Sequence, residues 1–260
     1  MTQRVDYDRV AATYDSRYEQ NTYTGVEQTL SSFVADAAAL HHRVLEVGCG
    51  TGHWVRRLRQ SRHMAFGVDP SAGMLQIARD SLRGHVIRGR AEALPCGSAS
   101  CDRLFCVNAL HHFSDPAGFL VEARRVLRSR GGVLTIGLDP HTGQDQWWVY
   151  DYFPAALNAD RKRYLPTGRI RELMTAAGFC RCETQMIQNL AREMTVGEAR
   201  SGGFLDRKDK SQLMVITDAE YEAGIKRIEA AETTDEASTI LRSDLRLYAT
   251  IGWIGDEISR

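Results

Sequence analysis

Between an apolar run and a helical pattern, the chain reads Val44-Leu45-Glu46-Val47-Gly48-Cys49-Gly50-Thr51-Gly52. The apolar run predicts a buried strand, and Trp54, Val55 and Leu58 predict the buried face of a following helix. Glycines at such a junction let the backbone turn tightly and approach a ligand without a side chain in between. The spacing is G-x-G-x-G, and His53 stands where a dinucleotide fingerprint has its third glycine. The spacing therefore disfavours an NAD-dependent oxidoreductase.

An acidic residue follows the next predicted strand. Ala65–Val68 is apolar, and Asp69 comes directly after it, 19 residues beyond Gly50. A carboxylate at this strand end can accept hydrogen bonds from both hydroxyls of a ribose. The loop and Asp69 together predict a nucleoside-containing ligand at the carboxyl ends of the strands. The alternative is that the loop is only a tight turn and Asp69 only precedes a helix, which Ser71 would cap.

Short apolar runs alternate with helical periodicity along the chain, which indicates an α/β protein. We predict one doubly wound fold with a seven-stranded, mostly parallel, Rossmann-like sheet, an N-terminal helical extension and a helical insertion before the last strand. The predicted strands lie near residues 44–47, 65–68, 85–88, 104–107, 133–136, 180–187 and 245–251. The predicted parts are an N-terminal helical cap (1–40), a cofactor-binding core (41–190), a helical insertion or lid (191–242) and a terminal strand that completes the sheet (243–260).

Composition narrows the class of protein. The 260 residues include 33 basic and 33 acidic side chains, so the net charge is zero. This balance disfavours capture of nucleic acid or an anionic membrane by bulk charge. No apolar run approaches the ~18–20 residues of a membrane span, and Met1–Asp8 lacks the apolar stretch of a signal peptide. We therefore expect a cytoplasmic protein. The six cysteines form no C-x-x-C pair, so neither a metal site nor a disulfide framework is expected.

Several motifs in order resemble those of a known family. Val44–Gly52 resembles the S-adenosylmethionine-binding motif of class I methyltransferases. Gly67–Ser71, Gly89–Pro95 and Leu110–Phe113 match further motifs of that family at the same spacing. The chain is similar to the methyltransferase type 11 branch, typified by the enzymes of ubiquinone and menaquinone biosynthesis. The likeness is strong over about residues 40–140 and looser over Val5–Tyr14.

The resemblance implies S-adenosylmethionine as the cofactor and assigns roles to matching residues. Glu46 would face the ammonium end of the cofactor, and Asp69 would hold its ribose hydroxyls. Many relatives have an acidic residue at the position of Arg90, so Glu92 would have to supply the adenine contact. The implied cofactor-binding residues are Tyr14, Glu46, Gly48, Cys49, Gly50, Asp69, Pro70, Ser71, Ala91, Glu92 and Asn108. A tyrosine that only packs between helices is the alternative for Tyr14.

Methyl transfer needs an in-line approach of the acceptor, and an acceptor hydroxyl or acidic carbon also benefits from a general base. His111 and His112 follow the fourth strand, where the methyl group is expected, and a histidine near its ordinary pKa suits that role. Asp139, after the fifth strand, is the next candidate. The alternative is that the two histidines only shape the loop.

The segment after Asp139 is rich in aromatic and basic residues. In this fold the segment often covers the acceptor, and aromatic walls suit a planar or apolar small molecule. The candidate acceptor-binding residues are Trp147, Trp148, Tyr152, Arg163 and Tyr164. The alternative is an amphipathic helix with a core aromatic stripe and a solvated charged face. The 191–242 insertion could be a lid or a dimer surface, so the chain is expected to be a monomer or a homodimer.

We therefore predict an S-adenosylmethionine-dependent methyltransferase that methylates an O, N or C atom of a small, aromatic or apolar metabolite, without nucleic-acid or membrane partners. The alternatives are a non-catalytic cofactor-binding regulator on the same fold and an RNA methyltransferase. Against the RNA enzyme, Asn108-Ala109-Leu110-His111 stands where a catalytic Asn-Pro-Pro-Tyr-like segment would be. No appended basic module follows either.

Overall fold

The computed structural model describes residues 7–9, 11, 14–15, 18, 21–35, 42–234 and 239–255. The chain divides into two compact units, which we treat separately. The core unit holds the described residues of 7–138, 165–188 and 247–255. The second unit holds the described residues of 139–164 and 189–246.

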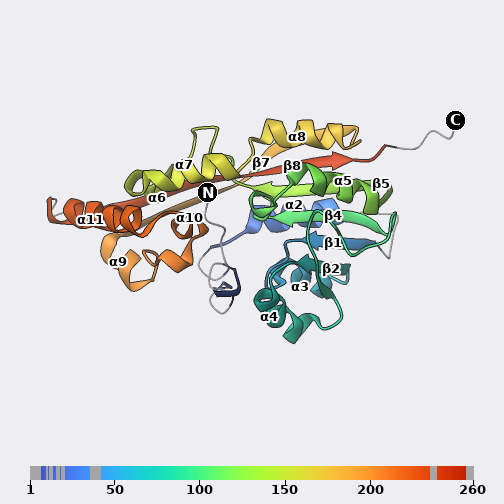
Figure 1. The fold of residues 1–260 in the computed structure, drawn as a ribbon, viewed down its shortest axis with the longest axis horizontal. Helices are drawn as coiled ribbons and strands as arrows, with labels where there is room; N and C mark the ends of the chain where they lie inside the picture. The colour runs from blue at the N-terminus through green and yellow to red at the C-terminus, as the bar shows by residue number, and fades with distance from the viewer. Residues whose placement is uncertain are drawn as a thin grey trace. The chain divides into compact units, whose positions relative to one another are not determined.

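The core unit is built on a mostly parallel sheet (Figure 1). The strand order is β3-β2-β1-β4-β5-β8, and β7 pairs with the far side of β8. The first five strands run parallel, and β8 runs antiparallel to β5. The strands are β1 (Arg43–Val47), β2 (Met64–Asp69), β3 (Val86–Arg88), β4 (Cys101–Val107), β5 (Leu127–Gly137), β7 (Arg181–Thr195) and β8 (Ile240–Trp253).

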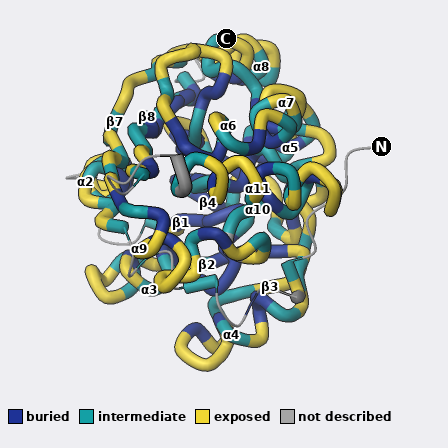
Figure 2. Tube along the Cα trace, turned by 90° about the vertical axis from the view of Figure 1, so that its left-hand side faces the viewer, coloured by how far each residue is buried: buried dark blue, intermediate teal, exposed yellow. Residues whose placement is uncertain are grey.

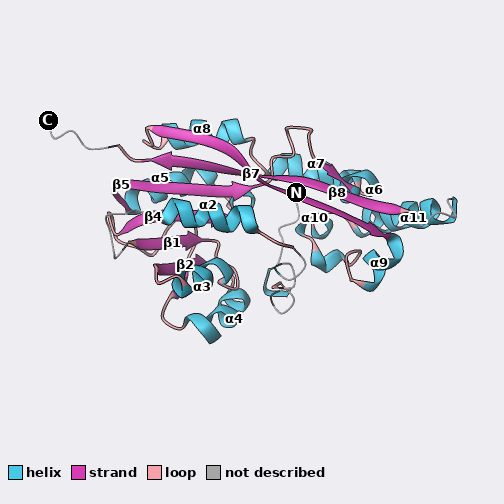
Figure 3. Cartoon of the chain, turned by 180° about the vertical axis from the view of Figure 1, so that it is seen from behind, coloured by secondary structure: helices cyan, strands magenta, loops and turns pink. Residues whose placement is uncertain are grey.

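Helices connect these strands and cover the sheet. Helices α3 and α4 lie beside each other next to β2 (Figure 3), and α5 packs against α8 and β5. Two of the helices begin at capping side chains, because Ser71 accepts a hydrogen bond from Met74 N and Asp115 accepts one from Gly118 N. The helices and 3-10 turns of the core unit are η1 (Tyr7–Arg9), α2 (Thr24–Val34), α3 (His53–Gln60), α4 (Ala72–Leu82), η3 (Leu110–His112), α5 (Pro116–Val126) and α8 (Thr167–Ala176).

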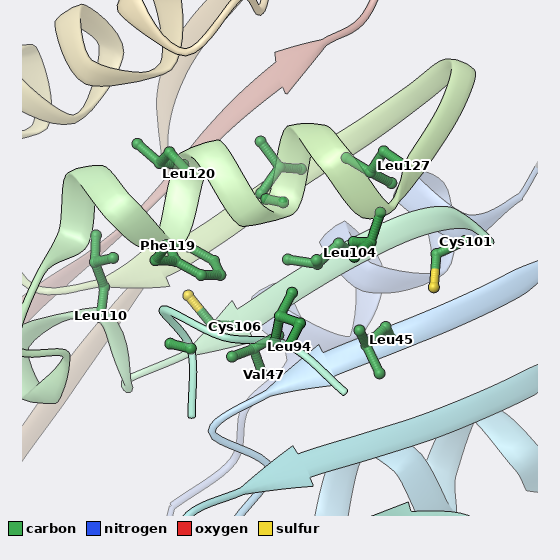
Figure 4. Close-up of a cluster of buried hydrophobic side chains, with 14 of the residues drawn as sticks. Leu45, Val47, Leu94, Cys101, Leu104, Cys106, Leu110, Phe119, Leu120 and Leu127 are labelled. Carbon is green, nitrogen blue, oxygen red and sulfur yellow. The ribbon is translucent and has the colours of Figure 1, made fainter. Parts of the chain in front are cut away.

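The hydrophobic core lies between the sheet and α5 (Figure 4). Phe119 projects from α5 toward the sheet and Leu120 lies on another side of the helix, and both are almost completely buried, as is Leu104 of β4. Burying side chains of this size contributes ~1.5–3 kcal/mol each to folding. Along the tube in Figure 2, the central strands are mostly buried and the outer faces of the helices are exposed. The rigid sheet therefore fixes the strand ends from which the site loops depart.

The second unit is mostly helical. Its two-residue strand β6 (Gln146–Trp147) pairs antiparallel with β8 through Asp244 and Ser243. The other elements are α6 (Trp148–Tyr152), α7 (Pro154–Arg163), α9 (Val196–Ser201), η4 (Arg207–Asp209), α10 (Ser211–Met214) and α11 (Asp218–Thr234). The four elements from α9 to α11 lie between β7 and β8 along the chain, as the predicted insertion requires.

The predicted fold class is confirmed, with corrections in detail. Among the described residues the sheet has eight strands rather than seven, because a two-residue strand such as β6 leaves no periodic signal. Strand β7 extends to Thr195 and β8 begins at Ile240, so both strands are longer than predicted and the helical insertion is shorter. The end of β7 was missed because it is polar and largely exposed, as an unpaired edge can be. The predicted domain boundaries remain a prediction.

Part of the predicted N-terminal segment, including Val5, Asp6 and Thr13, lies outside the described residues. In the described part of the chain, no helix is both long and apolar enough to cross a membrane.

Candidate cofactor and catalytic site

The glycine loop joins β1 to α3 and is held against the neighbouring strand. The backbone N–H groups of Gly48 and Cys49 both donate to the carbonyl oxygen of Val68, at 2.8 and 3.1 Å. Gly48 has a φ of +77° and Gly50 a φ of +53°, a region that side-chain-bearing residues seldom adopt. A Cβ atom on Gly48 would lie 2.6 Å from the Cβ of Ala109. The loop therefore requires glycine both for its turn and for the close approach of the next loop.

Gly48→Ala is expected to lower the free energy of unfolding by about 2 kcal/mol or more, because the left-handed backbone and the contact with Ala109 both oppose a Cβ. Urea unfolding monitored by circular dichroism measures the change. Gly97→Ala is the matched control, because a Cβ there meets no atom within 4 Å, and it should stay within about 0.5 kcal/mol of wild type. Equal stability of the two variants would contradict the assigned loop geometry.

Asp69 links the glycine loop to the start of α4. Its Oδ2 accepts a hydrogen bond from Gly50 N at 2.8 Å, and its Oδ1 accepts one from Ser71 N at 2.8 Å. The side chain is buried, and this burial raises its pKa despite the two hydrogen bonds. Each carboxylate oxygen can accept a further hydrogen bond. The carboxylate is thus held rigidly while keeping the capacity to bind two hydroxyl groups.

Glu46 carries a buried oxygen with no partner. The residue is 2% exposed, and burial, more than any other effect, raises its pKa well above the ordinary range. Val55 N donates to the carboxyl group, but no described residue donates a hydrogen bond to Oε2. A buried polar atom without a partner is costly, so a site of this kind is completed by a ligand that supplies a donor or a positive charge. The residues present therefore fit an ammonium group beside the glycine loop.

Glu92 and Arg90 hold the loop that follows β4. Glu92 Oε1 accepts hydrogen bonds from Ser114 N at 2.8 Å, Ser114 Oγ at 2.7 Å and Asp115 N at 3.2 Å. Burial opposes ionisation of Glu92, but these hydrogen bonds outweigh it and lower its pKa to about 2. Arg90 donates to Ser114 Oγ at 3.0 Å and pairs with Glu92 at 3.5 Å. The arginine that departs from the family pattern is thus part of this loop support.

Three predicted residues, Asn108, His111 and His112, lie just after β4 and in the turn that follows. Asn108 has a φ of +49°, and its N–H donates to Ile136 O at 2.8 Å. The rings of His111 and His112 lie 3.8 Å apart in η3. His112 Nε2 shares a 2.5 Å hydrogen bond with the hydroxyl of Tyr7, which lies 105 residues away in the sequence.

The N-terminal segment contacts each loop of the site. The Tyr7 ring lies edge-on to Tyr14, and Tyr14 Cε1 would lie 3.6 Å from a Cβ on Gly50. Asp8 accepts hydrogen bonds from Gly73 N, at 2.9 Å, and from the Ser71 hydroxyl. Asp15 accepts one from the Thr51 hydroxyl. The sequence analysis named Tyr14 as a candidate cofactor contact. It did not predict the hydrogen bonds of Tyr7, Asp8 and Asp15, because their partners are distant in the sequence.

His53, the first residue of α3, is stacked on Tyr18 with ring centroids 3.6 Å apart. Burial lowers its pKa to about 4, with smaller effects from Asp15, Arg56 and Arg57. Its unfolded pKa is ~6.5, so the unfolded chain binds more protons and stability falls as the pH decreases from about 6.5 toward 4. Because the ring is only half-buried, we expect a loss of ~1–2 kcal/mol between pH 7 and pH 4.

His53→Phe keeps a ring on Tyr18 and removes the titration. Urea unfolding at several pH values should therefore show a smaller acid-dependent loss of stability in this variant than in wild type. Identical pH dependence in the two proteins would refute the assigned role of His53.

In the core unit, Ala91 is buried and the carbonyl oxygen of Pro70 accepts a hydrogen bond from Arg88 at 2.9 Å. The predicted base Asp139 and the predicted acceptor-binding residues belong to the second unit. Asp139 is buried, and its Oδ1 accepts a hydrogen bond from His141 N at 3.1 Å in the turn after β5. Trp147, Trp148 and Tyr164 are also buried. Arg163 forms a 2.7 Å ion pair with Asp160, which is fully buried. Tyr152 is half-buried, and its carbonyl oxygen accepts a hydrogen bond from Arg227. In this unit, buried aromatic rings act as packing groups, and their predicted acceptor contacts remain a prediction.

Residues 45–135 match the family model described as "Methyltransferase domain". Over these residues the chain is similar to a methyltransferase domain. The predicted resemblance to class I methyltransferases is confirmed, and the cofactor of the methyltransferase domain is S-adenosylmethionine. The match spans the glycine loop, Asp69, Glu92 and His112.

Known proteins are similar in sequence to part of this chain. The uncharacterized methyltransferase YcgJ of Bacillus subtilis (strain 168) is 30% identical over 61% of this chain and 62% of its own length. The demethylmenaquinone methyltransferase of Thermotoga maritima is 34% identical over 43% of this chain and 50% of its own length. The crystal structure of YcgJ superposes with a TM-score of 0.60 at 20% identity, covering 90% of this chain and 100% of that one. The chain thus spans about half to three-fifths of the length of the curated relatives it matches.

In the described part of this chain, no group of three or more His, Cys, Asp or Glu side chains is arranged to hold a metal ion.

Proposed function

We propose that the chain transfers a methyl group from S-adenosylmethionine to an O, N or C atom of a small-molecule acceptor. The observation that carries this proposal is the arrangement of Glu46 and Asp69 on either side of the glycine loop. Glu46 offers a buried oxygen without a partner, and Asp69 offers an anchored carboxylate. These groups suit the ammonium and the ribose hydroxyls of the cofactor, respectively.

The bound cofactor would supply an electrophilic methyl group on a sulfonium sulfur. The role of this chain would be to hold the acceptor atom in line with the methyl group and to remove the proton of the acceptor. We assign proton removal to His112, because its ring shares a hydrogen bond with a second titratable side chain, Tyr7.

The tautomer of His112 determines which nitrogen is the base. A neutral imidazole has one donor and one acceptor nitrogen. When Nε2 carries the hydrogen and donates to the Tyr7 oxygen, Nδ1 is the nitrogen that accepts the proton of an acceptor O–H or N–H. Tyr7 is thus a positioning residue for the ring of His112. The reaction breaks the bond from sulfur to the methyl carbon and forms a bond from that carbon to the acceptor. The proton leaves on His112.

A small molecule suits this chain better than a nucleic acid, because the net charge is zero and provides no bulk attraction for a polyanion. A screen with labelled cofactor identifies the acceptor directly. Purified protein is incubated with S-adenosylmethionine that carries a deuterated methyl group and with pools of phenols, amines and carboxylic acids. Mass spectrometry should detect one labelled product and an equal amount of S-adenosylhomocysteine. Binding of the cofactor without turnover in any pool would contradict the proposal.

A further inference from the structure

Glu46 is a buried carboxyl group in the middle of the core sheet. Strand β1 lies between β2 and β4, and Glu46 is directly opposite Gly67 of β2 and Phe105 of β4. The residue is 2% exposed, and its Oε2 has no hydrogen-bond partner among the described residues. An ionised carboxylate in these surroundings would have neither water nor a donor at this oxygen, which is costly.

Among the described residues, the ionisable groups that act on Glu46 provide no positive charge. Asp69 of β2 carries the same sign of charge, and Cys49 of the glycine loop and Cys106 of β4 are thiols. Burial, followed by the charge of Glu46, raises the pKa of both thiols. Burial likewise has the largest effect in raising the pKa of Glu46, the N–H of Val55 opposes it, and Asp69 adds to it. A carboxyl group placed in this way is more stable in the neutral form.

A ligand ammonium group reverses this preference. Its positive charge favours the ionised carboxylate, and its N–H groups are donors for the oxygen that has none. A charge-assisted hydrogen bond is about twice as strong as one between neutral groups, so the carboxylate gains more from the ligand than the carboxylic acid does. The charge of Glu46 therefore depends on whether an ammonium group is bound.

We propose that Glu46 holds a proton in the free chain and that binding of the cofactor displaces it. This exchange rests on the proposed function. The O–H bond of the carboxyl group breaks, the proton passes to the solvent, and the carboxylate accepts a hydrogen bond from the ammonium group of the cofactor. A proton therefore competes with the ammonium group for Glu46, and the affinity for the cofactor decreases as the pH decreases.

Isothermal titration calorimetry on the full chain tests the exchange. S-adenosylhomocysteine is titrated at pH 7 in phosphate and in HEPES, because the two buffers take up a released proton with different heats. The matched probe is 5′-methylthioadenosine, which has the adenine and the ribose but no ammonium group. The binding of S-adenosylhomocysteine should release about half a proton to one proton more than the binding of 5′-methylthioadenosine. A proton released through Asp69 would appear with both ligands, because both carry the ribose hydroxyls.

The pH dependence of the two affinities gives a second measurement. From pH 6 to pH 7, the affinity for S-adenosylhomocysteine should increase by about three- to tenfold relative to that for 5′-methylthioadenosine, because one bound proton is exchanged for one ligand.

Glu46→Gln isolates the carboxyl group. The amide resembles the protonated acid but has no proton to release, so the excess proton release and the pH dependence of the affinity ratio should both disappear. Without ligand, this variant should unfold at the same temperature as wild type or higher at pH 7, because a neutral amide replaces a group that is costly to ionise. Glu183→Gln is the matched control, because Glu183 is an exposed acid on β7 of the core unit, and it should release protons as wild type does.

Equal proton release with the two ligands would overturn the exchange, and so would an excess that persists in Glu46→Gln. The comparison of the two ligands on the wild-type chain decides between these results without any variant. If S-adenosylhomocysteine binds without excess proton release, the exchange is refuted and the proposed function stands. If S-adenosylhomocysteine does not bind, the proposed function itself is refuted.

Discussion

Replacing Asp69 with alanine is expected to weaken the binding of S-adenosylhomocysteine by about 100-fold or more. The carboxylate would lose two charge-assisted hydrogen bonds to the ribose, each worth ~1.5–3 kcal/mol. It would also lose the hydrogen bonds from Gly50 N and Ser71 N that hold the two loops in register. Isothermal titration calorimetry measures the affinity, and thermal unfolding verifies that the variant is folded.

Asp80→Ala is the matched control for Asp69→Ala. Asp80 is an exposed acid on α4, in the same βαβ unit as Asp69. Its removal changes the net charge equally, so S-adenosylhomocysteine should bind this variant as it binds wild type. If both variants lose affinity equally, the effect is one of general charge and the assigned ribose contact is wrong.

Replacing His112 with alanine is expected to lower kcat by about 100- to 10,000-fold, the usual contribution of a positioned general base. Tyr7→Phe should lower kcat less, because the imidazole remains but loses the hydrogen bond that holds its ring. Turnover is measured with the acceptor that the labelled-methyl screen identifies. Cofactor affinity, measured by calorimetry, should stay within a few-fold of wild type in both variants.

His111→Ala distinguishes a base from a loop-shaping role. The two histidines are adjacent in η3, but Tyr7 bonds to His112. We expect His111→Ala to retain most of the wild-type turnover and Tyr7→Phe to shift the acid limb of the pH–rate profile. Wild-type turnover in His112→Ala would remove the base from the mechanism. A pH profile unchanged by Tyr7→Phe would remove the positioning role of the tyrosine.

The fold could be predicted where local sequence constrains it strongly. The β1 run, the three alternating glycines and the acidic end of β2 lie within a short stretch of chain, and each has a specific physical requirement. The capping role of Ser71 followed in the same way and is confirmed by its hydrogen bond from Met74 N. The far end of β7 was not predictable, because a polar edge strand has the same composition as a helical or loop segment.

The contacts that complete the site were beyond sequence reasoning. Tyr7 reaches His112 across 105 residues, and Asp8 reaches Gly73 across 65. Such pairs depend on how the N-terminal segment folds back, and no spacing rule encodes that. The role of Arg90 was similarly hidden, because its partner Ser114 comes from a separate loop. Burial was also needed to distinguish packing rings, such as that of Trp148, from exposed aromatic surfaces.

A crystal structure of the chain with S-adenosylhomocysteine tests the central claim most directly. We expect both ribose hydroxyls within hydrogen-bond distance of the Asp69 carboxylate, the ammonium group on the side of Glu46 and the sulfur on the side of the glycine loop that faces His112. A nucleoside bound elsewhere, or one bound at the loop without contact to Asp69, would contradict the account.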